Sequence, residues 1–157
     1  MKFVTFTRNG VEAPGVWLGD GKVVDLTPVA PTILALIEGG SIALDAARQL
    51  AGDASKAISA DGLTLLAPIP RTRKNVFCVG RNYIEHVAEG ARAMGTANKL
   101  PEVPQFFTKA PTAINAPGAP VRLDNGLTKL LDYEVELAVV IGKAGRDIPK
   151  ELSLIHI

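Results

Sequence analysis

Two glutamates near the end of the sequence have a spacing that suits a metal site. Glu134 and Glu136 are separated by one residue within residues 133–141, where side chains alternate between two faces. Because residues two apart in a strand point to the same side, we expect these carboxylates to lie together. Carboxylates held together out of water repel each other unless a proton or cation joins them, and Mg²⁺ and Mn²⁺ prefer oxygen ligands. The alternative is a polar strand face at a sheet edge, which the spacing alone favours.

A histidine and a carboxylate form a second candidate pair. His86 and Glu89 lie three residues apart in a predicted helix, on a face away from its apolar stripe. A carboxylate beside an imidazole fixes its tautomer and raises its basicity, as a general base that activates water requires. The alternative is a solvated helix surface with ordinary ion pairs, and the spacing alone favours it. His86 is the only histidine outside the last six residues, so it has no imidazole partner for a zinc site.

Other residues give weaker indications. Lys109 follows an apolar strand and could face an anionic substrate, or it could extend along the surface into solvent. Gly80 could supply a backbone turn that lets a ligand approach. The single Cys78 lies in an apolar strand and is interpreted as core packing. The sequence contains no glycine-rich phosphate loop and no serine on a nucleophile elbow.

The elements of the first 70 residues are predicted from turn residues and apolar runs. Strands are expected over residues 3–7 and 16–18, joined near Asn9-Gly10, and over 22–26 after Asp20-Gly21. Helices are expected over residues 32–38 and 42–50. Ser41 is the expected N-cap of the second helix, and Gly52 is expected to end it.

The later elements must position the candidate residues. A strand over residues 76–79 ends at Gly80, and a helix starts near Tyr83 with Asn82 as its expected N-cap. The helix has an apolar stripe at helical spacing, formed by Ile84, Val87, Ala88 and Ala91. Short strands are expected over residues 105–109 and 133–141, separated by a proline-rich, non-helical path.

Composition excludes several classes of protein. The chain has 157 residues, 47% hydrophobic and 21% charged, so it can bury a core. A net charge of +1 argues against nucleic-acid binding, and no apolar run approaches the ~18 residues of a membrane span. The single cysteine and the absence of a signal-peptide core favour a cytoplasmic protein. Residues 1–70 carry a net charge of −2 and the remaining 87 a net of +3, which suggests two units with a boundary at Pro68 and Pro70.

Three ordered motifs resemble the fumarylacetoacetate hydrolase family. They are G-R-N-Y-I-E-H-V-A-E at residues 80–89, F-F-T-K at residues 106–109, and D-Y-E-V-E-L at residues 132–137. Residues 1–70 are similar to the small N-terminal domain of bacterial members. The resemblance implies an α+β, mainly β fold, in which a small N-terminal β domain with short helices precedes the first part of a mixed β-roll. The implied catalytic-domain portion covers residues 71–151.

The family resemblance also implies roles for the candidate residues. His86 and Glu89 become the water-activating dyad, and Glu134 and Glu136 become ligands of Mg²⁺ or Mn²⁺, with Ca²⁺ as a further possibility. Residues expected to bind substrate are Arg81, Tyr83 and Lys109. The implied reaction is hydrolytic C–C cleavage of an acylpyruvate or β-diketo acid, in aromatic catabolism, by a homodimer. Alternatives are isomerisation, decarboxylation or hydration of a small anionic 2-oxo acid, or a non-catalytic β-domain.

The resemblance departs from the family at the end of the chain. The family's third metal ligand, an aspartate, and a catalytic lysine lie further downstream than Ile157. Residues 152–157 do not resemble the family's helix and can be encoded by a sequencing-library adapter. We therefore expect a truncated reading frame with a foreign tail, in which His156 has no functional meaning.

An expected consequence of truncation is that the 157-residue chain is inactive and marginally folded. An unpaired strand edge and an uncovered apolar face at Val135, Leu137 and Val139 favour association between chains. Purified protein should oligomerise or precipitate, and should show no turnover of acylpyruvates or oxaloacetate with Mg²⁺. Light scattering and a turnover assay check this expectation. A monomer with a cooperative melt and measurable hydrolysis would contradict it.

Overall fold

The structure is a computed structural model, and it describes residues 1–97 and 99–152. Two units can be distinguished, and each is described by itself: residues 1–70 grouped with the described part from residue 115 onward, and residues 71–114. The described part is α+β with more strands than helices, as the sequence predicts. The predicted domain limits stay a prediction. Residues 153–157 of the expected foreign tail lie outside the described residues.

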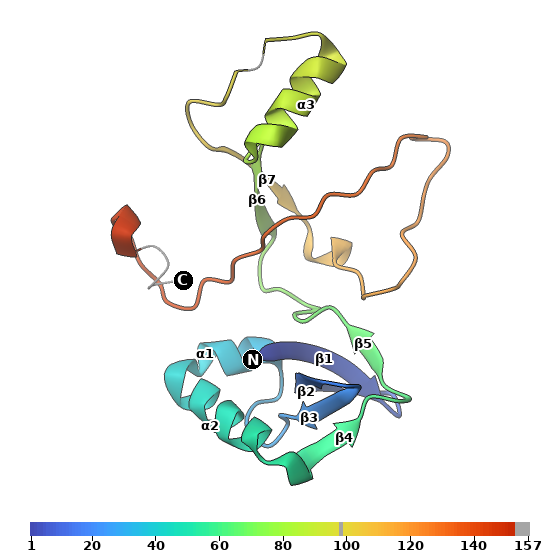
Figure 1. The fold of residues 1–157 in the computed structure, drawn as a ribbon, viewed down its shortest axis with the longest axis vertical. Coiled ribbons are helices and arrows are strands. Elements are labelled where there is room, and N and C mark those ends of the chain that lie inside the picture. Colours follow the sequence, from blue (N-terminus) through green and yellow to red (C-terminus); the bar gives the residue numbers. More distant parts are fainter. Residues whose placement is uncertain (98, 153–157) are drawn as a thin grey trace. The chain divides into compact units, whose positions relative to one another are not determined.

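A five-stranded antiparallel sheet forms the N-terminal part, in the order β4-β3-β2-β1-β5 (Figure 1). Its strands are β1 (Lys2–Arg8), β2 (Val11–Gly19), β3 (Lys22–Asp25), β4 (Ala57–Ser59) and β5 (Thr64–Leu66). Asn9-Gly10 joins β1 to β2, and Asp20-Gly21 joins β2 to β3. All four residues have positive φ, between 48° and 79°, as tight hairpin turns require. Both predicted turns are confirmed.

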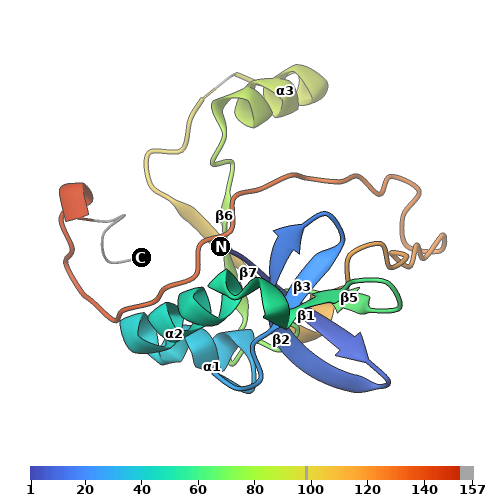
Figure 2. The same ribbon diagram turned by 60° about the horizontal axis from the view of Figure 1, so that its bottom comes forward.

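Two helices follow β3 and lie side by side against the sheet (Figure 2). The first, α1 (Ile33–Glu38), begins where the hydroxyl of Thr32 accepts a hydrogen bond of 3.0 Å from the Ala35 amide. The second, α2 (Gly40–Gly52), runs two residues past its predicted end, so that Gly52 lies inside it and Asp53 is the C-cap, and its expected N-cap is wrong as well. Gly39 occupies the N-cap, and no side chain of the described structure caps the helix. Ser41 lies inside the first turn because the helix starts at Gly40, at φ 61°, two residues earlier than expected.

The alternation of side chains along the strands separates two apolar clusters. One cluster packs under the helices, and its buried members are Val16, Leu26, Ala30, Ile33, Leu36 and Ala47. The other is formed by Phe6, Ala13 and Val23. Phe3 packs against the first cluster and Phe6 belongs to the second, because residues three apart in a strand point to opposite faces. The N-terminal sheet is therefore apolar on both faces.

The unit of residues 71–114 consists of a two-stranded ladder and a helix. The strands β6 (Val76–Gly80) and β7 (Gln105–Lys109) are antiparallel, and α3 (Ile84–Met94) follows β6. Both strands are confirmed, but Asn82 as the helix cap is wrong. Tyr83 is the N-cap, in an extended conformation and without a side-chain cap in the described structure. The helix starts at Ile84, so Asn82 lies one residue too early to cap it.

The helix α3 buries two members of its predicted apolar stripe and leaves the first exposed. Val87 and Ala91 are buried, whereas Ile84 at the start of the helix is exposed. After β7 the chain forms the short 3-10 turn η2 (Pro111–Ala113), within the predicted proline-rich path. No helix among the described residues has the length and apolar character that crossing a bilayer requires.

The expected strand over residues 133–141 is wrong for this structure. The described part from residue 115 onward contains no strand, and its only helical segment is the short 3-10 turn η3 (Lys150–Leu152). Tyr133, Val135 and Leu137, which should face a core, are 82–89% exposed. An alternating pattern defines the two faces of a strand but supplies no hydrogen-bond partner, and a strand forms only beside one.

Truncating a buried side chain beneath the helices should test the N-terminal core. Leu36 is 0% exposed in the cluster under α1 and α2, whereas Leu18 on β2 is 43% exposed. We expect Leu36→Ala to lower the free energy of unfolding by about 2–5 kcal/mol, because it removes buried methyl groups and leaves a cavity. Leu18→Ala is the matched control and should change it by about 0.5 kcal/mol or less. Urea denaturation measures both values, and equal losses would contradict the assigned core.

Candidate functional site

The turn between β6 and α3 positions most of the candidate residues. The ladder pairs Gly80 with Gln105, and the chain then reverses through Arg81, which has φ 51°. This left-handed conformation is uncommon for a residue other than glycine and is found at functional sites. A Cβ placed on Gly80 would lie 3.6 Å or more from its nearest neighbours, an ordinary contact. The structure therefore places the turn at Arg81, and not at Gly80 as the sequence suggested.

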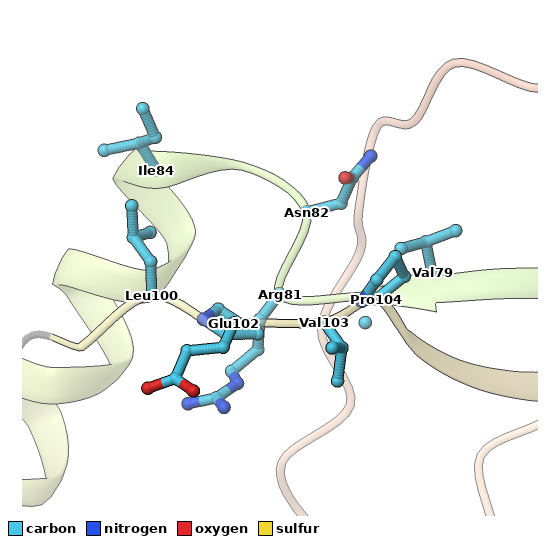
Figure 3. Close-up of a pocket in the computed structure, with 10 residues that line it drawn as sticks. Val79, Arg81, Asn82, Ile84, Leu100, Glu102, Val103 and Pro104 are labelled. Carbon is cyan, nitrogen blue, oxygen red and sulfur yellow. The ribbon is translucent and has the colours of Figure 1, made fainter. Parts of the chain in front are cut away.

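The side chain of Arg81 is held by the neighbouring strand. Its Nε donates a hydrogen bond of 3.0 Å to Oε1 of Gln105. The bond uses one of the five donors of the guanidinium group and leaves the Nη donors available to a ligand. Figure 3 shows Arg81 and Glu102 extending to the same side of the chain, whereas Asn82 points the other way.

A hollow of about 280 Å³ lies at this turn (Figure 3). Its lining comes from the end of β6, the turn, the start of α3 and residues 100–104. A second hollow of about 510 Å³ shares Arg81 and Glu102 with the first. Glu102 forms an exposed ion pair with Lys99, at 3.0 Å between Nζ and Oε1. The negative charge of Glu102 therefore has a cation partner within its own loop.

The proposed dyad lies on α3. His86 and Glu89 are both exposed, and a spacing of three residues places them on neighbouring positions of one helix face. Tyr83, a further candidate, is 42% exposed at the N-cap of the same helix. Four of the candidate residues thus come from one continuous stretch, residues 81–89.

The other substrate-binding candidate, Lys109, lies at the far end of the ladder from Arg81. Lys109 pairs with Val76 and Gln105 pairs with Gly80, so the two ends are separated by four residues, or roughly 13 Å. The ammonium group of Lys109 lies 6.0 Å from the ring centroid of Phe107. Cys78 is half-buried in β6, on the same ladder.

The expected metal ligands belong to the other unit and are considered separately from the dyad. Glu134 and Glu136 are exposed, in a stretch without helix or strand. Carboxylate oxygens have the right chemistry for Mg²⁺ or Mn²⁺, but a pair supplies only part of a coordination shell of about six oxygens. Within residues 1–97 and 99–152, no three His, Cys, Asp or Glu side chains lie together as a metal site. The donor type fits a hard cation, and the described site is incomplete.

Sequence reasoning missed Gln105. Its type is unremarkable at the start of a short strand, and it becomes relevant only because the register of β6 and β7 brings it beside Arg81. The expected strand over residues 105–109 and the predicted end of β6 at Gly80 were the available signals. Nothing local in the sequence specifies which residue of β7 faces that end.

Comparison with known protein families assigns the chain to one family. The C-terminal domain of fumarylacetoacetate (FAA) hydrolase matches residues 75–157, which include β6, α3, β7 and both glutamates. The chain belongs to the fumarylacetoacetate hydrolase family. This match confirms the family that the three motifs indicated.

Individual relatives carry two kinds of enzyme name. An oxaloacetate tautomerase of Bacillus subtilis, YisK, is 35% identical over 100% of this chain and 57% of its own length. A mitochondrial oxaloacetate tautomerase of Homo sapiens is 31% identical over 100% of this chain and 50% of its own. A 2,4-didehydro-3-deoxy-L-rhamnonate hydrolase of Sphingomonas is 30% identical over 98% of this chain and 49% of its own length. The chain thus spans about half the length of these relatives.

Proposed function

We propose that the full-length protein is a metal-dependent enzyme that acts on the carbonyl region of a 2-oxo acid. The observation that carries the proposal is the exposed pair His86 and Glu89 on one face of α3, inside the segment that the family domain matches. The first candidate reaction is keto–enol tautomerisation of oxaloacetate. It is supported by relatives that carry this name and align over the whole chain.

Tautomerisation requires one group that moves a proton between carbon and oxygen. We propose that the imidazole of His86 accepts a proton from the carbon next to the 2-oxo group and returns it to the oxygen, or the reverse. Glu89, on the neighbouring turn of α3, would accept a hydrogen bond from the other ring nitrogen and fix the tautomer of the imidazole. Both groups are exposed, so substrate can reach them from solvent.

Substrate carboxylates need cationic or hydrogen-bonding partners. We propose that Arg81 and Tyr83 bind a carboxylate of the substrate, since both lie within five residues of His86. Lys109, at the other end of the β6–β7 ladder, remains a proposed contact for a second anionic group. The guanidinium of Arg81 is the strongest candidate because its planar donors match a carboxylate.

A divalent cation completes the proposal. Glu134 and Glu136 would hold Mg²⁺ or Mn²⁺, or Ca²⁺, through their carboxylate oxygens. When bound, the ion would polarise the 2-oxo group and stabilise negative charge on its oxygen. The two side chains would also balance the charge of the ion, which is a role that neither amide nor hydroxyl groups could fill.

The second candidate is hydrolytic C–C cleavage of an acylpyruvate or β-diketo acid. The hydrolase from Sphingomonas favours it, because that relative also aligns over nearly the whole chain. His86 would then take a proton from water, and the resulting hydroxide would attack the distal carbonyl. The C–C bond breaks to give a carboxylic acid and the enolate of a 2-oxo acid, which is then protonated.

Two assays separate the two reactions. Enol oxaloacetate given to the full-length protein should convert to the keto form faster than in buffer, which the loss of enol absorbance measures. An acylpyruvate should release a free carboxylic acid only if the protein is a hydrolase. Inactivity towards both substrates, with and without Mn²⁺, would favour the non-catalytic alternative.

The remaining features of the proposal concern compartment and assembly. We propose a cytoplasmic protein that forms a homodimer when full-length and takes a small anionic 2-oxo acid as its substrate. Nucleic acid is not a proposed partner, because the net charge is +1 and the excess of basic residues is small. Sedimentation of the full-length protein measures the oligomeric state.

Replacing the proposed base should lower turnover without removing the metal. We expect His86→Ala to lower kcat by about 10²–10⁴, the usual contribution of a positioned general base, and to leave Mn²⁺ affinity nearly unchanged. Glu89→Gln should have a smaller effect, because it keeps a hydrogen bond and loses only the charge. Glu85→Gln is the matched control on the same exposed helix and should be neutral. Full turnover by His86→Ala at saturating substrate would make His86 a surface residue.

Removing either proposed ligand should abolish metal binding and activity together. Glu134→Ala and Glu136→Ala each take away an oxygen ligand and a negative charge, so we expect Mn²⁺ binding to be lost in calorimetry of the full-length protein. Glu151→Ala, which changes an exposed glutamate of η3, is the matched control and should bind Mn²⁺ normally. Unchanged Mn²⁺ affinity in both glutamate variants rules out the assignment.

A further inference from the structure

The contact between Arg81 and Gln105 defines the direction of a guanidinium group. A free arginine side chain has many rotamers, and ordering it on binding a ligand costs free energy. Here Nε of Arg81 is tied to the amide oxygen of Gln105 at 3.0 Å. The backbone pairing of Gly80 with Gln105 and the left-handed turn at Arg81 place the two side chains together.

The bond also selects how a carboxylate can approach. A guanidinium group can pair with a carboxylate through Nε and one Nη, or through its two Nη groups. Gln105 occupies the Nε donor, so only the pair of Nη groups remains for a bidentate contact. Both hollows at the turn are lined by Arg81, and the nearby Glu102 has its own cation partner in Lys99.

We infer that Gln105 is a positioning residue that holds the Arg81 guanidinium ready to bind the carboxylate of a 2-oxo acid through its two Nη groups. The inference rests on the proposed function, in which Arg81 binds a substrate carboxylate. Gln105 does not touch the substrate in this arrangement and acts through Arg81 alone. Its contribution is preorganisation, which raises affinity by lowering the entropy lost on binding.

The test uses pyruvate, the simplest 2-oxo acid, and NMR of the arginine Nε–H groups in the full-length protein. Arg81→Lys identifies the Arg81 signal by its loss. Pyruvate should shift that signal in the unmodified protein, and isothermal titration calorimetry gives the Kd of every variant, including those without the signal. Gln105→Leu should raise the Kd about 3- to 10-fold, as expected when a flexible side chain must be ordered on binding. It should also speed exchange of the Arg81 Nε proton with water.

Two further variants separate the positioning of Arg81 from a general effect on the β6–β7 ladder. Thr108→Val removes the exposed hydrogen bond from Asn75 to Thr108, which joins the same two segments at 3.3 Å, and should leave the Kd unchanged. In the Arg81→Lys background, Gln105→Leu should have no additional effect, because the Nε donor is already gone. Melting temperatures of all variants confirm that the unit remains folded.

The outcomes are distinguishable from those that test the function. If Gln105→Leu and the unmodified protein have the same Kd for pyruvate, the inference is overturned and the proposed function is unaffected. The inference is also overturned if Gln105→Leu raises the Kd by the same factor in the Arg81→Lys background as in the unmodified protein. No pyruvate-dependent shift of Arg81 in an enzyme that still turns over oxaloacetate removes the role of Arg81, and the inference with it. A Gln105 effect on pyruvate binding without any turnover supports the inference and contradicts the proposed reaction.

Discussion

Strand pairing is the constraint on which the whole structure depends. A strand's backbone N–H and C=O groups need partners, and water is the only alternative to a neighbouring strand. Each strand of the N-terminal sheet has such a partner, and its two faces bury apolar side chains. The β6–β7 ladder satisfies the same requirement with one antiparallel pair of strands. Residues 133–141 alternate as clearly as any of these, yet they form no strand ladder in the described part of the chain and remain exposed.

This constraint explains which features the sequence could predict. The turns at Asn9-Gly10 and Asp20-Gly21 were predictable because a two-residue turn with positive φ is specified by its own residues. Capping by Ser41 was not, because the cap position depends on where the chain leaves α1, and Gly40 starts α2 early. The prediction of a strand over residues 133–141 failed for a different reason. A strand needs a partner strand, and a partner belongs to another segment of the chain, about which a local pattern carries no information.

The candidate site likewise contains features that the sequence could predict and features that it could not. His86 and Glu89 could be placed on one helix face from their spacing alone, because the backbone hydrogen bonds that define a helix form within the helix itself. The left-handed conformation of Arg81 and its bond to Gln105 could not be predicted. They depend on a register between strands separated by the whole of α3 and the loop after it. The residue that sequence reasoning missed is therefore the one whose role arises from a non-local pairing.

The proposed chemistry consequently has two parts with different structural requirements. The proton-transferring pair and Arg81 are positioned within residues 76–109 by one ladder and the helix inserted into it. The two glutamates can act as paired ligands only where residues 133–141 are extended, since only an extended backbone directs side chains two apart to the same side. Metal affinity should therefore depend on strand pairing at residues 133–141. Carboxylate binding at Arg81 should depend only on the β6–β7 register, because the atoms that hold the guanidinium belong to that ladder and its turn.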